Sequence, residues 1–293
     1  MKGPAAPTVS IGLPVYNAER FLSQALDSLL AQTLADFELV ISDNASMDLT
    51  ARICLEYAAR DRRIRYIRQP SNIGAIPNWN FLARQARGRY FKWASANDYC
   101  DARMLDKCVA VLEADPGAVL CHGRTCMVDE DTGEQHPFEQ DVSALDARPS
   151  ERFRHVSRNL VLNNALCGVM RTKAALQTPL QRLYAAGDVV FTIELSLYGR
   201  IVLLPEVLFY RRFGRHTWSR LLKPADREVF LFGAVGVHPG DGRWRRRVDL
   251  FRAVLAAPIG AGEKWRTLFQ AAQRAGGRSP VKALRRVKGP HRA

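Results

Sequence analysis

Short apolar runs alternate with longer amphipathic segments along the first hundred residues. The run at residues 9–15 ends in a polar elbow, after which apolar side chains recur at every third or fourth position, at Phe21, Leu22, Ala25, Leu26, Leu29 and Leu30. This pattern predicts a strand followed by an amphipathic helix. Further strand-type runs lie at residues 37–41, 64–67 and 90–94, so the sequence predicts an α/β sheet.

The second half of the chain also divides into strands and helices, with a less regular order. Strands are predicted at residues 118–123, 124–128, 167–170 and 203–212. Helices are predicted near residues 151–163 and 172–178, and a third has apolar residues at 189, 190, 193 and 197. These boundaries suggest three segments, at residues 1–115, 116–219 and 220–293.

Length and composition suit a folded globule. The 293 residues are 47% apolar, enough for one large or two modest domains. The sequence has no run of 18 apolar residues and no signal-type N-terminus, so we expect neither secretion nor membrane spanning. Its six cysteines lack C-x-x-C spacing, and we therefore expect buried, reduced thiols in a cytoplasmic protein.

Charge is unevenly distributed along the chain. Residues 211–293 contain 20 Lys or Arg and 5 Asp or Glu, whereas the first 210 residues contain 23 and 24. A nearly neutral body thus carries a strongly basic tail, an asymmetry typical of an interaction segment. Basic charge attracts phosphate regardless of sequence, but no nucleic-acid recognition motif accompanies it, and we expect no specific nucleic-acid partner.

The basic tail also has helical amphipathicity. Its apolar positions form two faces, at Trp244, Val248, Phe251, Val254 and Leu255, and at Trp265, Leu268, Phe269 and Ala272. Such faces, rimmed by arginine, fit an anionic membrane surface, where each basic residue contributes about 1 kcal/mol. This interpretation predicts a peripheral protein on the inner face of the cell membrane. Alternatively, both helices pack their apolar faces on the body and expose the arginines.

Polar residues follow the predicted strands at their carboxyl ends, where α/β sheets bind ligands. The first strand is followed by Pro14, Tyr16 and Asn17, and the second ends at Asp43. A carboxylate at this edge can accept a charge-assisted bond from the imino N–H of uracil or thymine. Asn72 and Gly74, after the third strand, tolerate positive φ and fit a tight turn.

The order of these motifs resembles the family 2 glycosyltransferases. P-V-Y-N, D-N-A-S, N-x-G, N-D after a strand, G-D before a helix and Y-R…H occur in the family's order over residues 8–219. The resemblance implies a GT-A-like, Rossmann-type α/β fold with a mixed, mostly parallel sheet flanked by helices. It also implies a nucleoside-diphosphate sugar donor, bound by Pro14, Tyr16, Asn17, Asp43, Asn72 and Gly74.

The resemblance further implies a divalent-metal site, where this sequence departs from the family. Members carry a motif similar to D-A-D-D after the fourth strand, and this chain has Ser95-Ala96-Asn97-Asp98. Asp98 is then the metal-ligating carboxylate for Mg²⁺ or Mn²⁺, with Asn97 as a neutral oxygen donor. These ions often take only one or two carboxylates and add substrate phosphates, so we expect weak affinity for the free metal.

A Gly187-Asp188 pair before a predicted helix matches the position of the family's catalytic base. An acceptor hydroxyl must lose its proton as it attacks the anomeric carbon, and a nearby carboxylate can accept that proton. A plain helix cap is the alternative role for Asp188. Arg211 and His216 fall in the family's Tyr-Arg and His segment, which implies that they balance the charge of the diphosphate.

These motifs together predict an inverting glycosyltransferase of the hexosyltransferase type. It would move a sugar from a nucleoside-diphosphate sugar to a hydroxyl of a glycan or lipid-linked acceptor, in cell-envelope polysaccharide synthesis. Residues 1–115 are assigned as the nucleotide-sugar-binding half, 116–219 as the acceptor-binding half of the same domain, and 220–293 as the basic helical tail.

Two other functions are compatible with parts of the pattern. A sugar nucleotidyltransferase also uses an α/β sheet and Mg²⁺, but it needs a Gly-rich basic loop after the first strand, which Pro14 and its neighbours do not provide. A non-catalytic relative that binds nucleotide sugar or membrane is the stronger alternative, because Ser95 and Asn97 stand where the family has carboxylates.

Overall fold

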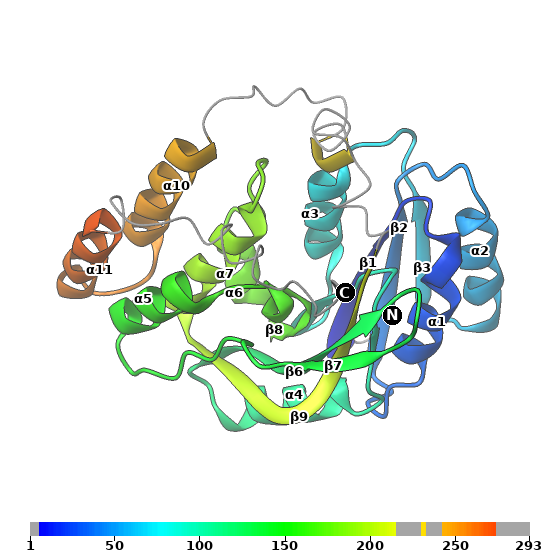
Figure 1. Cartoon of the computed structure of the whole chain (residues 1–293), viewed down its shortest axis with the longest axis horizontal. Coiled ribbons are helices and arrows are strands. Elements are labelled where there is room, and N and C mark those ends of the chain that lie inside the picture. Colours follow the sequence, from blue (N-terminus) through cyan, green and yellow to red (C-terminus); the bar gives the residue numbers. More distant parts are fainter. Residues whose placement is uncertain (1–5, 215–229, 233–241, 274–293) are drawn as a thin grey trace, which may run out of the picture.

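The computed structural model describes residues 6–214, 230–232 and 242–273 (Figure 1). Their strands form one sheet in the order β3-β2-β1-β4-β8-β6-β9-β5, with β7 paired to β6. The strands are β1 (Val9–Val15), β2 (Phe37–Asp43), β3 (Ile64–Arg68), β4 (Tyr90–Trp93), β5 (Tyr99–Cys100), β6 (Ala118–Asp129), β7 (Gln135–Phe138), β8 (Val169–Arg171) and β9 (Arg200–Phe213).

Helices flank this sheet, as the sequence predicts, and the last two, α10 and α11, pack against other helices. They are α1 (Glu19–Leu30), α2 (Thr50–Arg60), α3 (Ala75–Gln85), α4 (Met104–Ala114), α5 (Pro149–Asn159), α6 (Thr172–Leu176), α7 (Gly187–Tyr198), α10 (Gly242–Ala256) and α11 (Ala261–Gln273), together with the 3₁₀ turn η1 (Asn164–Cys167). Of the described helices, none is long and apolar enough to cross a membrane.

The N-terminal half of the sheet is parallel. β1 pairs with β2 and β4, and β2 pairs with β3, all in the parallel sense, while α1, α2 and α3 make the connections. β1 and β2 are buried almost throughout. Parallel strands covered on both faces give continuous apolar runs, which explains why the sequence pattern predicts them well.

The second half joins through the short strand β8, which is antiparallel to both β4 and β6. The strands predicted at 118–123 and 124–128 are one continuous strand, β6. Gly123 lies within it because a Cβ there would come 2.5 Å from the Cβ of Leu208 on β9, and the register of β6 against β9 shifts beside it. The helix predicted near 151–163 ends at Asn159, since Leu160 adopts an extended conformation.

The C-terminal helices pack on the body through only part of their apolar surface. Leu250, Ala253, Val254 and Ala257 are buried and α10 contacts α7. α11 contacts α5, where Glu263 Oε2 accepts a bond from Ser150 N (3.0 Å). The large side chains of the outer face are exposed, namely Trp244, Phe251, Leu255, Trp265 and Phe269. Packing on the body therefore explains why Val254 is apolar, but it does not explain why these five exposed residues are apolar.

The close approach of the segment before β4 to β1 gives a test of the fold. A Cβ on Gly88 would lie 2.6 Å from Ser10 N and 2.8 Å from Val9 C, both backbone atoms of β1. We expect Gly88→Ala to lower the free energy of unfolding by about 1–3 kcal/mol, as overpacking does, measured by urea denaturation. Gly260→Ala is the control, because nothing lies within 4 Å of its added Cβ, and equal stability of the two variants would contradict the expectation.

Candidate active site

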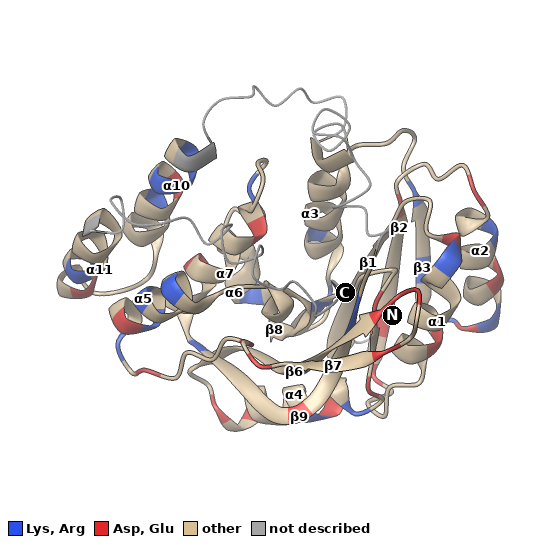
Figure 2. Ribbon diagram, viewed as in Figure 1, with Lys and Arg blue, Asp and Glu red and all other residues tan. Residues whose placement is uncertain are grey.

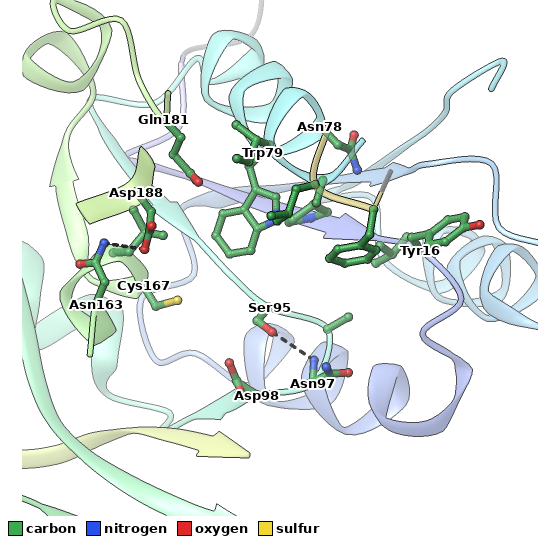
Figure 3. Close-up of a pocket in the computed structure, with 18 of the residues that line it drawn as sticks. Tyr16, Asn78, Trp79, Ser95, Asn97, Asp98, Asn163, Cys167, Gln181 and Asp188 are labelled. Carbon is green, nitrogen blue, oxygen red and sulfur yellow. Dashed lines mark hydrogen bonds between the residues drawn. The ribbon is translucent and has the colours of Figure 1, made fainter. Parts of the chain in front are cut away.

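A cavity of about 390 Å³ lies where the loops after β1, β2 and β4 face η1 and the start of α7. Six residues expected in a functional site line it, namely Pro14, Tyr16, Asn97, Asp98, Asp188 and Arg211. Asn17, Asp43, Asn72 and Gly74 are not part of this lining, and His216 falls outside the described residues. Figure 3 shows Asp98 with Ser95 and Asn97 on one wall, and Asp188 beside Asn163 on another.

Asn17 joins the loop after β1 to the loop after β2. Its backbone N donates to Ser46 Oγ (3.0 Å) and its side-chain oxygen accepts from Met47 N (2.9 Å). Its φ of 46° is in the left-handed region, which asparagine tolerates better than most residues. Asn17 thereby fixes the backbone that carries Tyr16 into the cavity wall.

Asp43 is fully buried at the end of β2. Its carboxylate accepts bonds from Ser46 N (2.8 Å), Tyr66 Oη (2.7 Å) and an Arg68 guanidinium nitrogen (2.7 Å). Burial of the Tyr66 hydroxyl beside this carboxylate raises the pKa of Tyr66 to about 12. Both oxygens of Asp43 thus hold the loop together, and its neighbour Asn44 lines the cavity; base recognition by Asp43 stays a prediction.

Asn72 and Gly74 form the turn that the sequence predicts before α3. Asn72 Oδ1 accepts from Gly74 N (2.8 Å) and from the side-chain amide of Asn44 (2.7 Å). Gly74 has a φ of 88°, a conformation that favours glycine. This turn starts α3 at the position from which Asn78 and Trp79 reach the cavity.

Asp98 is held by β9. Its Oδ1 accepts from the backbone N of Arg212 (2.9 Å), and the Arg212 guanidinium donates to the Asn97 carbonyl. Burial raises the pKa of the Asp98 carboxyl above its usual range, opposed by the charge of Arg211 and by the bond from Arg212. A partly buried carboxylate with too little compensating charge is a suitable place for a cation.

Asp98 and Asn97 fit a divalent ion that takes only part of its ligands from the protein and the rest from a bound substrate. Within the described ranges there is no group of three or more His, Cys, Asp or Glu arranged to hold a metal. One carboxylate from Asp98 and one amide oxygen from Asn97 match Mg²⁺ or Mn²⁺ that takes its other ligands from phosphate and water.

Asp188 lies in the first turn of α7 and does not cap it, since Ala186 is the N-cap residue. Its Oδ2 accepts a bond from Asn163 Nδ2 (3.0 Å). The Asn163 amide is itself oriented by Thr192, whose hydroxyl donates to Asn163 Oδ1 (2.9 Å). Gly187 is required before it, because a Cβ there would lie 2.0 Å from the Arg182 carbonyl oxygen.

Arg211 is oriented by Asn164, the residue that directly follows Asn163 and begins η1. Its guanidinium donates to Asn164 Oδ1 (2.6 Å), and the Asn164 amide donates to Asp141 Oδ1 (2.9 Å). The consecutive residues Asn163 and Asn164 thus orient the candidate base Asp188 and the candidate phosphate-binding side chain of Arg211. Neither asparagine was predicted from the sequence, where the only signal is a pair of polar residues after the apolar segment at 160–162.

A family model and curated relatives match this chain. The model of glycosyl transferase family 2 matches residues 10–178. The uncharacterized protein Mb1547 of Mycobacterium bovis is 30% identical over 212 residues, covering 69% of this chain and 58% of that protein. The uncharacterized glycosyltransferase EpsJ of Bacillus subtilis is 39% identical over 101 residues, covering 34% and 29%. The chain thus spans less than two thirds of the length of these relatives.

Solved structures show a similar fold. TarS 1–349 of S. aureus in complex with UDP-GlcNAc matches with a TM-score of 0.65 and 18% identity, over 96% of this chain and 76% of that chain. The mannosyltransferase PcManGT of Pyrobaculum calidifontis, in complex with GDP-Man and Mn²⁺, matches with a TM-score of 0.51 and 17% identity, over 96% and 79%.

The sheet order and the cavity at its carboxyl edge define a GT-A type glycosyltransferase fold. Since the family model covers more than half of the sequence, the chain belongs to glycosyl transferase family 2. The predicted family and fold class are both confirmed.

Proposed function

We propose that this chain catalyses an inverting, single-displacement transfer of a sugar from a nucleoside-diphosphate sugar to a hydroxyl of a glycan or lipid-linked acceptor. The observation that carries the proposal is that one cavity is lined by Asp188 and also by Asp98 and Arg211. The UDP-GlcNAc of the TarS complex and the GDP-Man of the PcManGT complex support this class of donor.

Asp188 is the proposed general base. The acceptor oxygen forms a bond to C1 of the sugar while the bond between C1 and the diphosphate oxygen breaks, and Asp188 takes the hydroxyl proton. Because Asn163 donates to one carboxylate oxygen of Asp188, the orientation of the carboxylate is restrained before the acceptor arrives. Attack from the face opposite the diphosphate inverts the configuration at C1.

The departing diphosphate gains negative charge, which the other side of the cavity is suited to stabilise. Arg211 presents a guanidinium held by Asn164, and preorganised cations of this kind lower the energy of a transition state that develops charge. A bound Mg²⁺ or Mn²⁺, with Asp98 and Asn97 as its protein ligands, would neutralise phosphate charge as a Lewis acid.

We further propose that the outer face of α10 and α11 rests on an anionic membrane at the inner side of the cell envelope. Trp265 and Phe269 are 74% and 67% exposed, and Trp244 is 64% exposed. Large apolar surfaces exposed on a protein commonly mark an interaction site. Basic residues on the same helices (Figure 2) complement anionic lipid headgroups, which supports an acceptor carried at the membrane.

Replacing the proposed base tests the chemistry. We expect Asp188→Asn to keep nucleotide-sugar affinity within about threefold while turnover falls at least about a hundredfold, the usual contribution of a general base. Release of nucleoside diphosphate from a panel of nucleotide sugars, with and without candidate acceptors, is the measurement. Asp106→Asn, an exposed carboxylate in α4, is the control. Unchanged turnover in Asp188→Asn would remove Asp188 from the mechanism, and an inactive wild type would favour the non-catalytic relative.

Two substitutions with opposite expected effects on metal-dependent nucleotide affinity test the proposed metal ligands. Asp98→Ala should weaken Mn²⁺-dependent binding of nucleoside diphosphate, whereas Asn97→Asp should tighten it by adding a second hard oxygen ligand. Calorimetric titration with and without Mn²⁺ measures both. If neither variant changes the metal-dependent part of the affinity, the metal lies elsewhere.

The membrane proposal is tested by the outer face itself. The double variant Trp265→Ser/Phe269→Ser should bind phosphatidylglycerol vesicles at least about tenfold more weakly than the wild type. The reason is that burying each of these side chains in the membrane contributes about 1.5–3 kcal/mol to binding. Raising the salt from about 0.1 M should weaken the remaining wild-type binding. Leu55→Ser on α2, also exposed, is the control, and identical vesicle binding by all three proteins would refute the proposal.

A further inference from the structure

Arg182 is a nearly buried arginine in the segment at residues 180–186, which leads into α7. Its side chain is 11% exposed and is not part of the cavity lining. Its guanidinium makes two bonds, from Nη1 to the carbonyl oxygen of Leu180 (2.7 Å) and from Nη2 to Glu194 Oε2 (2.7 Å). Glu194 lies on α7, so one side chain ties the 180–186 segment to the helix that carries Asp188.

A second carboxylate faces the same guanidinium from α10. Asp249 Oδ2 lies 3.9 Å from Arg182 Nε, and the Asp249 side chain is 19% exposed. The packing of α10 on α7 brings this carboxylate to the 180–186 segment. Because carboxylates of two helices attract the guanidinium, its orientation toward the Leu180 carbonyl is restrained.

The ion pair of Arg182 with Glu194 is a costly one. Glu194 is 1% exposed, and its burial raises the pKa of its carboxyl above the usual range, opposed by the charge and the bond of Arg182. Apolar residues of similar volume often serve the stability of a fold as well as a buried ion pair does. Buried ion pairs can instead specify one conformation of the chain around them, and the conformation at stake here is that of the 180–186 segment.

The 180–186 segment has an unusual backbone at both ends. Leu180 and Ala186 have φ of 62° and 66°, left-handed conformations that such residues keep only when their surroundings enforce them. Between them Gln181 lines the cavity, and Asn80 of α3 accepts from its N (3.1 Å) and donates to its O (2.8 Å). The segment is therefore held from α3 by Asn80 and from α7 through Arg182.

The backbone of Arg182 also bears on the start of α7. Its carbonyl oxygen occupies the place that a Cβ on Gly187 would take, directly before Asp188. Asp188 and Glu194 are six residues apart and so lie on different faces of the helix. One face is held at Asn163 (Figure 3) and the other at Arg182, so a shift of the 180–186 segment would move the base.

We propose that Arg182 is a positioning residue for the catalytic base, holding the segment that places Asp188 against the acceptor hydroxyl. The assignment rests on the proposed function, in which Asp188 takes the proton. Arg182 touches neither donor nor acceptor, so it acts on turnover rather than on nucleotide affinity. Misplacing a reacting group by about 1 Å can slow a reaction about a hundredfold.

The experiment compares turnover with donor affinity in Arg182→Met, which keeps an apolar stem and removes the guanidinium. We expect its kcat, measured as release of nucleoside diphosphate, to fall about ten- to a hundredfold. The calorimetric affinity for UDP or GDP, whichever the wild type binds, should stay within about twofold. Arg52→Met is the control, because Arg52 forms an exposed ion pair with Glu56 on α2 (3.5 Å), and it should change neither quantity.

A second variant separates positioning from folding. Arg182→Met leaves the Glu194 carboxylate buried without its partner, which destabilises the fold. Arg182→Met/Glu194→Met removes both charges and should unfold at a higher urea concentration than Arg182→Met. Its kcat should nevertheless stay at least about tenfold below that of the wild type. Recovery of wild-type kcat together with stability would overturn the positioning role.

Combining variants shows whether Arg182 acts through the base. Adding Arg182→Met to Asp188→Asn should lower kcat by less than about twofold more, because the group that Arg182 positions is already gone. A further loss as large as in the wild-type background, or wild-type turnover in Arg182→Met, would overturn the proposal. A wild type without turnover, or an Asp188→Asn variant as active as the wild type, would instead refute the proposed function.

Discussion

The insertion of β8 between β4 and β6 is the constraint on which the site depends. This strand is three residues long, yet it joins the parallel half of the sheet to the second half. Lys92 of β4 is buried beneath it and donates to the carbonyl of Cys167, while the Thr172 hydroxyl donates to the Gly88 carbonyl (2.7 Å). Separating β8 from β4 would leave the buried Lys92 ammonium with only the Trp93 carbonyl (3.3 Å) of its two carbonyl partners, which is costly.

That junction also sets the composition of the cavity. The loop after β4 carries Asn97 and Asp98, and the residues just before β8 carry Asn163 and Asn164. Pairing β4 with β8 therefore brings a candidate metal loop and the two orienting asparagines to one cavity. Arg212 then holds this candidate metal loop from β9, through its backbone N to Asp98 and its guanidinium to the Asn97 carbonyl.

The sequence predicted the elements that bury continuous apolar surface and failed where polar residues act through tertiary contacts. β1, β2 and α1 follow from apolar runs and helical periodicity. β5 and η1 are short and have no period of their own, so only their neighbours define them. Asp188 and Asp98 were found by resemblance, whereas Asn163 and Asn164 have meaning only through partners 23 to 47 positions away in the sequence.

Leu180 and Ala186 are both left-handed, with φ of 62° and 66°, and they bracket the segment that carries Gln181 and leads to Asp188. Each costs about 1–3 kcal/mol that glycine would not. Yet glycine would give the unfolded chain, and this loop, more conformations. A selection for thermal stability alone would thus favour glycine at both positions and loosen the wall beside Asp188. The present sequence thus keeps a strained and more rigid wall beside Asp188 at some cost in stability.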